Sequence, residues 1–260
     1  MSMLPHFEIV GEGRQTIVIC NGLSQSTANW RGLARQNPKY RWLLFDARGH
    51  GRSPLGDTPY DLDKHVGDLL RVLHEAGGET PLLMGFSHGG RVALRAAAEF
   101  GTRFCGLVVV SCAARVTVRR RAHVASWEQC LKLGGVGAMA WASLPNIVGR
   151  KILERYPDLS LLVKGSIARN REAGLSAMFE GMAGYPPIEE DARRIELPTL
   201  ILRGEEDPLV AAADERDLCR WISGARAACF DGCGHTLPLE EPVLFMQAVS
   251  GFLNALNGSH

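Results

Sequence analysis

The stretch LLMGFSHGG, from Leu82 to Gly90, places a Gly-x-Ser-x-Gly sequence directly after a short apolar run. Residues 92–100, which follow it, are rich in alanine and leucine and predict a helix. A strand, a sharp turn and a helix around such a serine form a nucleophile elbow, which lifts the hydroxyl above the carboxyl end of the strand. The pattern therefore predicts that Ser87 is a nucleophile, and its alternative role is to cap the helix.

A serine hydroxyl needs a base that takes its proton and a carboxylate that orients the base. His235 lies in a glycine-containing loop between a predicted strand at 225–230 and a predicted helix at 243–256. Asp207 comes just after a predicted strand at 199–203. The order Ser87, Asp207, His235 along the chain is the one found in α/β-hydrolases. We therefore predict a Ser–His–Asp triad, with a surface-loop role as the alternative for His235.

Two other residues are candidates for the carboxylate of this triad, because Glu205 and Glu206 directly precede Asp207. Any of the three acids could instead be solvated. We favour Asp207 because the following Pro208 fixes the local turn.

Three further motifs make the chain similar to the α/β-hydrolase-fold family over nearly its whole length. DARGHGRS at 46–53 resembles a D-x-R-G-x-G-x-S loop, GEED at 204–207 resembles a G-x-x-D acid turn, and GH at 234–235 with EP at 241–242 resembles a G-H-x(n)-E-P ending. The resemblance implies a mostly parallel, doubly wound sheet with an inserted helical cap. It specifies the substrate only weakly, because the fold carries many activities.

Two backbone amides are expected to stabilise the oxyanion of the reaction. One belongs to His88, the residue after the nucleophile. By resemblance to the family, the other belongs to Leu23, in the loop after a predicted strand at 16–20. The family usually has His-Gly at this turn, whereas this chain has Asn21-Gly22. The imidazole of His88 is expected to pack beneath the loops, with no part in the chemistry.

Apolar runs predict buried strands at 16–20, 42–45, 82–86, 107–111, 199–203 and 225–230. Helical patterns lie between them, at 62–75, 92–100, 212–221 and 243–256. The alternation predicts a doubly wound α/β sheet. It is interrupted at 113–187, where the sequence is helical in character. We therefore predict a core formed by 1–112 and 188–260, with a cap formed by 113–187.

A cap above the serine would exclude water and shape the substrate pocket. Seven apolar cap residues are therefore candidates for substrate contact, and packing between cap and core is the alternative for each: Trp127, Leu131, Met139, Trp141, Met178, Phe179 and Met182.

Four arginines gather at the start of the predicted cap, at Arg115, Arg119, Arg120 and Arg121. A solvated helix face is the ordinary reason for such a cluster. The alternative is a docking site for an acidic partner, such as an acyl carrier protein that bears the substrate.

Composition excludes several other classes. The formal net charge of +1 gives no attraction to nucleic acid or to an anionic membrane. No apolar run approaches the roughly 18 residues of a membrane span, and residues 1–10 lack the pattern of a secretory signal. The seven cysteines form no C-x-x-C pair and favour reduced thiols in a cytoplasmic protein, although Cys229 and Cys233 lie close in sequence. No pattern indicates a metal or another cofactor, and the polar residues 257–260 are expected to be disordered.

Together these features predict a cytoplasmic serine hydrolase that cleaves a carboxylic ester or lactone through an acyl-enzyme. The chain most resembles small capped carboxylesterases, including enol-lactonases and the methyl ester esterases that act on carrier-bound substrates. Epoxide hydrolases and haloalkane dehalogenases are disfavoured, because they carry an aspartate where this chain has Ser87. An acyltransferase, a perhydrolase and a receptor that retains the fold remain alternatives.

Overall fold

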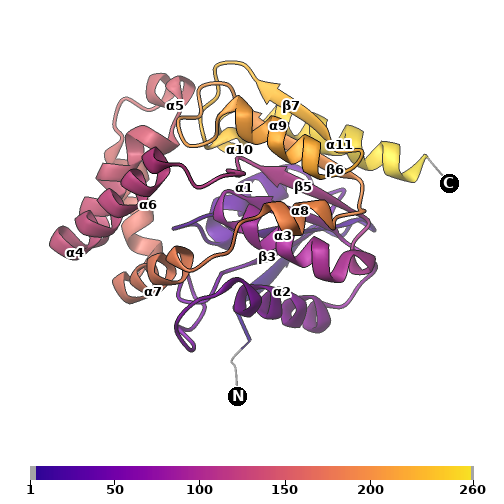
Figure 1. The fold of residues 1–260 in the computed structure, drawn as a ribbon, viewed down its shortest axis with the longest axis horizontal. Helices are drawn as coiled ribbons and strands as arrows, with labels where there is room; N and C mark the ends of the chain where they lie inside the picture. Colours follow the sequence, from indigo (N-terminus) through magenta and orange to yellow (C-terminus); the bar gives the residue numbers. More distant parts are fainter. Residues whose placement is uncertain (1–3, 259–260) are drawn as a thin grey trace.

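A seven-stranded sheet forms the centre of the computed structural model, which describes residues 4–258 (Figure 1). Its strand order is β1-β3-β2-β4-β5-β6-β7. The first strand pairs antiparallel with β3 and all other neighbours pair in parallel, which confirms the mostly parallel sheet. The strands are β1 (Phe7–Val10), β2 (Thr16–Cys20), β3 (Arg41–Phe45), β4 (Leu82–Phe86), β5 (Gly106–Val110), β6 (Thr199–Gly204) and β7 (Arg226–Phe230).

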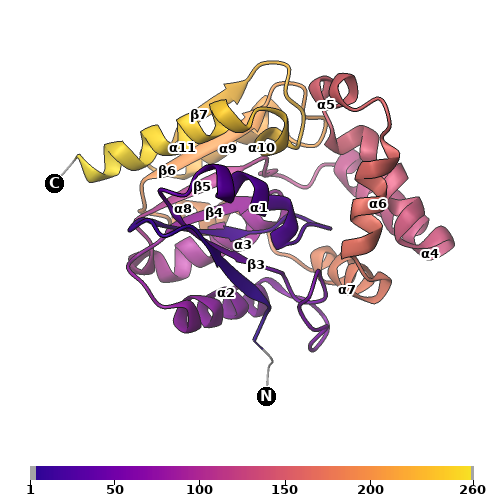
Figure 2. The same ribbon diagram turned by 180° about the vertical axis from the view of Figure 1, so that it is seen from behind.

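Helices cover both faces of the sheet, and a further group of helices lies beside the carboxyl ends of its strands. The covering helices are α1 (Thr27–Gln36), α2 (Leu62–Ala76), α3 (His88–Phe100), α8 (Glu189–Arg193), α9 (Ala212–Trp221), α10 (Leu237–Glu240) and α11 (Pro242–Asn257). A short 3₁₀ helix, η1 (Gly101–Arg103), follows α3. Figures 1 and 2 show α2, α3, α8 and α9 on one face, and α1 and α11 on the other.

Alternation along the strands divides the core between these two faces. In β2, Val18 packs in the cluster that contains Leu69 of α2 and Leu94 of α3. Its neighbour Ile19 packs in the other cluster, with Phe245 of α11. Because successive side chains of a strand point to opposite faces, a strand covered on both sides has no position that faces solvent. All five residues of β2 are accordingly buried.

The six predicted strands are confirmed, with ends that shift by at most one residue. The prediction of buried strands fails at β7, which is an edge strand with exposed Arg226, Ala227 and Cys229. Strand β1 and helix α1 were not predicted from the sequence. At the carboxyl end of the chain, Asn257 still belongs to α11, whereas the expectation for 259–260 concerns residues outside the described part.

Of the five helices between β5 and β6, the first four group beside the carboxyl ends of the strands (Figure 1). They are α4 (Val118–Ile147), α5 (Arg150–Arg155), α6 (Ser160–Arg169) and α7 (Glu172–Ala183), and we call them the cap helices. Non-helical backbone at Gly134 and Gly135 divides α4 into two parts. Within residues 4–258, the structure contains no helix that is both long and apolar enough to span a membrane.

Candidate active site

Ser87 occupies a strained turn between β4 and α3. Its φ is 53°, which residues with a side chain rarely adopt. The turn is tight, because a Cβ atom on Gly89 would lie 2.0 Å from the carbonyl oxygen of Cys20, and one on Gly85 would lie 2.4 Å from that of Gly89. The amide of Ser87 donates to the carbonyl of Val110 over 2.8 Å. Only glycine fits beside this serine, which explains the Gly-x-Ser-x-Gly spacing.

The structure brings Ser87, His235 and Asp207 together from three separate loops. His235 Nε2 lies 2.8 Å from Ser87 Oγ, and His235 Nδ1 lies 2.8 Å from Asp207 Oδ2. An ionised carboxylate only accepts hydrogen bonds, so Nδ1 carries the proton and Nε2 is left to accept from the serine hydroxyl. The other oxygen of Asp207 accepts from the amides of Leu209 and Val210, at 2.8 and 3.1 Å. These bonds fix the carboxylate below the imidazole.

The two glutamates beside Asp207 have other partners. Glu205 Oε2 accepts from the amide of Gly232 over 3.0 Å, and Glu206 lies 3.6 Å from the guanidinium of Arg150. Both glutamates are exposed, whereas the side chain of Asp207 has no accessible surface. Of the three acids, only Asp207 contacts His235.

A buried carboxylate that the sequence analysis missed holds the histidine loop. Glu240 is fully buried, and its oxygens accept from the amides of Gly234 and Gly149 at 2.8 and 3.2 Å, and from the Thr236 hydroxyl at 3.0 Å. Gly234 directly precedes His235, and Gly149 directly precedes cap helix α5. One carboxylate thus joins the histidine loop to the cap. In the sequence, Glu240 directly precedes the Glu241-Pro242 pair of the G-H-x(n)-E-P ending. That position was the available signal, but only Glu241 was considered.

The two expected oxyanion donors lie beside the serine. His88 is the first residue of α3, where helix amides are free to bind an anion. Leu23 lines the same cavity as Ser87 and precedes Ser24, whose φ is 61°. The side-chain nitrogen Nδ2 of Asn21 donates to the carbonyl of Phe45 over 2.5 Å. Asparagine at this family position is thus accommodated, because it ties the loop to β3.

The imidazole of His88 points away from the triad. Its Nε2 lies 2.9 Å from the hydroxyl of Tyr185, and its ring packs 5.1 Å from that of His65. Burial lowers the pKa of His88 to about 3, with a smaller effect from the nearby charges of His50 and Arg91. The ring is therefore a neutral packing group.

Lowering the pH from 7 to 5 is expected to reduce the free energy of unfolding by about 2 kcal/mol through His88 alone. The unfolded chain protonates this histidine near its ordinary pKa of about 6.5, whereas the folded chain resists protonation down to about pH 3. The stability it contributes is complete above pH 6.5 and is lost as the pH falls towards 3. Urea unfolding at both pH values measures it. His88→Gln should shrink the difference and the exposed His74→Gln should not; an undiminished difference in His88→Gln would contradict this account.

A cavity of about 160 Å³ opens onto Ser87 and His235. Of the seven apolar cap candidates, Trp127 and Met139 line it. Sequence reasoning missed a further part of the wall, which α4 and α6 supply: Ala140, Ser143, Leu144, Ile147, Leu162, Val163, Ser166 and Arg169.

The other five candidates do not line the cavity. Leu131 and Phe179 are buried in a cluster within the cap. Met178 and Met182 pack against Tyr60 and Ala47 of the core. Trp141 is 50% exposed on the outer surface of α4. Met178 and Met182 therefore pack between cap and core, which was the alternative interpretation, whereas Leu131 and Phe179 pack within the cap.

The arginine cluster is divided by its contacts. Arg120 pairs with the buried Asp214 and also donates to the carbonyl of Leu209. Arg115 pairs with Asp217 and stacks on the ring of Trp221 at 5.0 Å. These two arginines join the start of the cap to the core, whereas Arg119 and Arg121 are exposed on α4.

The cysteines are all free thiols. Cys229 is exposed on β7, whereas Cys233 is buried with its sulfur 3.7 Å from Lys151 Nζ. The two residues near the histidine loop therefore form no disulfide.

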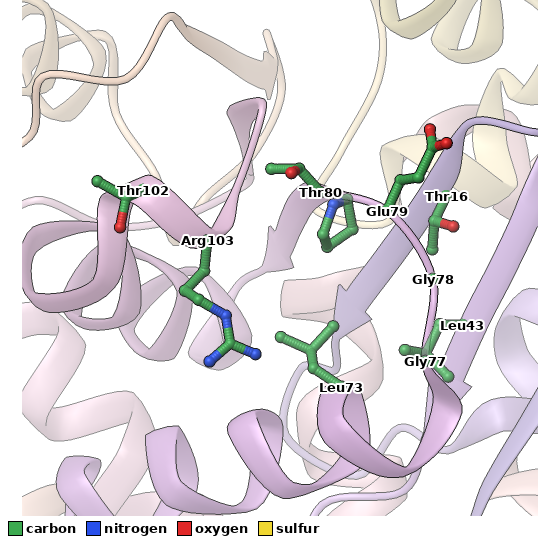
Figure 3. Close-up of a pocket in the computed structure, with 10 residues that line it drawn as sticks. Thr16, Leu43, Leu73, Gly77, Gly78, Glu79, Thr80, Thr102 and Arg103 are labelled. Carbon is green, nitrogen blue, oxygen red and sulfur yellow. The ribbon is translucent and has the colours of Figure 1, made fainter.

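A second cavity, of about 170 Å³, lies at the opposite end of the sheet. Its wall includes Thr16, the first residue of β2, and Pro81, which precedes β4. Figure 3 shows Arg103 and Leu73 facing each other across it. Ser87 follows the carboxyl end of β4, so this cavity is separate from the triad.

Comparison with known proteins gives consistent matches over most of the chain. A family model described as "Serine aminopeptidase, S33" matches residues 11–242. A putative 2-succinyl-6-hydroxy-2,4-cyclohexadiene-1-carboxylate synthase of Bacillus subtilis (strain 168) is 26% identical, over 93% of this chain and 91% of its own. 3-Oxoadipate enol-lactonase 2 of Acinetobacter baylyi is 23% identical, over 94% and 90%. The crystal structure of the enol-lactonase from Burkholderia xenovorans LB400 superposes with a TM-score of 0.86 at 25% identity and covers 96% of both chains.

Proposed function

Because the chain belongs to the serine aminopeptidase S33 family of α/β-hydrolase-fold enzymes, we propose that it hydrolyses a carboxylic ester or lactone with Ser87 as its nucleophile. The observation that carries the proposal is the pair of 2.8 Å contacts that link Ser87 to His235 and His235 to Asp207. A base within hydrogen-bond reach of the nucleophile, itself oriented by a carboxylate, is the arrangement that activates a serine hydroxyl.

In the proposed reaction, His235 Nε2 takes the hydroxyl proton as Ser87 Oγ attacks the substrate carbonyl. The amides of Leu23 and His88 stabilise the negative oxygen of the tetrahedral intermediate. His235 then returns the proton to the leaving alcohol, and an ester of Ser87 remains. A water molecule, deprotonated by the same imidazole, repeats the attack and releases the acid. Asp207 stabilises the imidazolium in both steps.

The lining of the cavity favours esters and lactones over peptides. An aminopeptidase must hold the positive α-amino group of its substrate, and a carboxylate is the usual partner for such a charge. Among the described residues that line the cavity, none is aspartate or glutamate. The relatives named enol-lactonase support the same choice, since they match more than nine-tenths of the chain.

A panel of substrates tests the proposal. The panel consists of p-nitrophenyl esters, lactones and thioesters of graded chain length, together with an amino acid p-nitroanilide. Each substrate is assayed alone, with an added alcohol and with hydrogen peroxide. Turnover of esters or lactones to the free acid would support hydrolysis. Transfer of the acyl group to the alcohol would favour the acyltransferase, and peracid formation with hydrogen peroxide the perhydrolase. Preferred cleavage of the anilide would refute the proposal that the substrate is an ester or lactone. Absence of any turnover would favour the alternative that the protein is a receptor which retains the fold.

A carrier-bound methyl ester is the finer part of the proposal, and it concerns Arg119 and Arg121. Their exposed side chains on α4 could meet an acidic carrier, whereas Arg115 and Arg120 already bind core carboxylates. Replacing both exposed arginines by glutamate should raise KM for a carrier-bound ester about tenfold and spare a small ester, because like charges then face each other. Steady-state kinetics on the two substrates measure this. An equal change for both would refute carrier docking.

A further inference from the structure

Arg169, the last residue of α6, brings an unpaired positive charge to the cavity of Ser87. It lines the cavity, and its side chain is partly buried. Its Nε atom is buried without a hydrogen-bond acceptor. In the described part of the chain no carboxylate lies within ion-pair distance of its guanidinium, whereas Arg120 and Arg150 of the cap helices each have such a partner.

The surroundings of Arg169 make this charge unfavourable unless a ligand binds it. The cavity wall supplied by α4 and α6 is mainly apolar and includes Leu144, Ile147, Leu162 and Val163. Burial lowers the pKa of Arg169, and no acidic group counteracts this effect. A partly desolvated cation without a partner reduces stability. An anion in the cavity would supply the missing hydrogen bonds.

The backbone holds Arg169 in a fixed relation to the catalytic loops. Its carbonyl accepts from the amide of Gly51 over 3.1 Å. The next residue, Asn170, donates its side-chain amide to the carbonyl of Ser24 over 2.9 Å. Ser24 follows the proposed oxyanion donor Leu23. The guanidinium therefore extends from a segment that is bonded directly to the loop beside the nucleophile.

We propose that Arg169 binds a carboxylate of the substrate, so that the preferred ester or lactone carries a free carboxylate besides the acyl group that is cleaved. The inference rests on the proposed hydrolase function and names its substrate class. A guanidinium matches a carboxylate in charge and can hold both of its oxygens. Ser166, one helical turn earlier on the same wall, provides a hydroxyl as a further donor. A phosphate monoester fits less well, because this wall offers one positive charge against nearly two negative ones.

The test compares charged and neutral substrates of equal length. The charged set is the mono-p-nitrophenyl esters of C4 to C8 dicarboxylic acids, and the neutral set has a methyl group in place of the free carboxylate. Arg169→Gln is expected to lower kcat/KM for the best charged ester about tenfold to a hundredfold, as loss of a hydrogen bond to a charged group implies. The neutral esters should change less than about twofold, because they do not use the guanidinium. Lys164→Gln is the matched control, since it removes an exposed charge from the same helix outside the cavity.

A second variant moves the guanidinium without removing it. A Cβ atom on Gly165 would lie 2.8 Å from Arg169 Nη1, so Gly165→Ala must displace the group. Alanine also favours the helix, so the variant should fold. Its preference for charged esters should fall, while neutral esters react as before.

The possible results separate this inference from the proposed function. Equal rates for charged and neutral esters, unchanged in Arg169→Gln, would overturn the carboxylate site and leave the hydrolase intact. If no ester is cleaved, the hydrolase proposal fails, and calorimetry still tests the site. Adipic acid monomethyl ester should bind to Ser87→Ala protein at least about tenfold more tightly than the dimethyl ester, and addition of Arg169→Gln should abolish the difference. Equal affinities would overturn the inference.

Discussion

Replacing Ser87 by alanine is expected to lower kcat for every ester substrate by about 10⁵-fold to 10⁶-fold, the loss seen when the nucleophile of such a triad is removed. The variant keeps the cavity and the hydrogen bond between His235 and Asp207, but has no oxygen that can form the acyl-enzyme. KM should change little, because the contacts that bind the substrate remain. Single-turnover and steady-state assays with p-nitrophenyl butyrate measure both quantities.

The control for this variant is its folding. The backbone amide of Ser87 donates a hydrogen bond to the carbonyl of Val110, and alanine retains this bond. Both residues carry a Cβ atom at a φ of 53°, so the strain of the turn is unchanged. Urea unfolding of Ser87→Ala should thus lie within about 1 kcal/mol of the unchanged protein. Undiminished hydrolysis by the folded variant would exclude Ser87 as the nucleophile.

The core of the fold could be predicted because its signals are local and repeated. Parallel strands covered on both faces appear as apolar runs, and the elbow needs glycine at fixed positions. The antiparallel strand β1 gave no such signal, because only four residues pair with β3 and none of them is fully buried. A signal for α1 was present in Trp30, Leu33 and Ala34, which lie on one helical face and are buried.

The cap could not be predicted in the same detail, because its apolar residues face the cavity, packed clusters or solvent. Met139 and Trp141 are two positions apart on α4, so they point to nearly opposite sides of the helix. The structure places Met139 in the cavity wall and leaves Trp141 half exposed. Both are large and apolar, and hydrophobicity alone does not distinguish them. The break at Gly134 and Gly135 also prevents extrapolation from Trp127 to the second part of the helix.

The proposed role of Arg169 could not be predicted from the sequence at all. A lone arginine near a helix end has the appearance of a surface residue, since most arginines are exposed. Its position became informative only when its neighbours were known, because a missing partner is a property of the folded chain. Pro208 favoured Asp207 among three consecutive acids, and the structure then shows that Asp207 contacts His235 whereas Glu205 accepts from Gly232.

Replacing Asp207 by asparagine is expected to lower kcat by about 10⁴-fold at neutral pH. Asparagine has nearly the same shape and can keep the amides of Leu209 and Val210 bonded through its oxygen. Its side-chain nitrogen then faces His235 Nδ1 and donates a hydrogen bond to it. The imidazole must move its proton to Nε2, so it can no longer accept a proton from Ser87. The negative charge that stabilised the imidazolium is lost as well.

Glu206→Gln is the matched control, because it removes one negative charge from the adjacent residue without touching His235. Glu206 is exposed and lies 3.6 Å from Arg150, so its loss should change kcat less than about twofold. The kcat of both variants is measured from pH 5 to 9, together with urea unfolding. A loss shared equally by Asp207→Asn and Glu206→Gln would indicate a general effect of charge. A large loss confined to Glu206→Gln would move the orienting role to that residue, whereas the expected result assigns it to the carboxylate that contacts Nδ1.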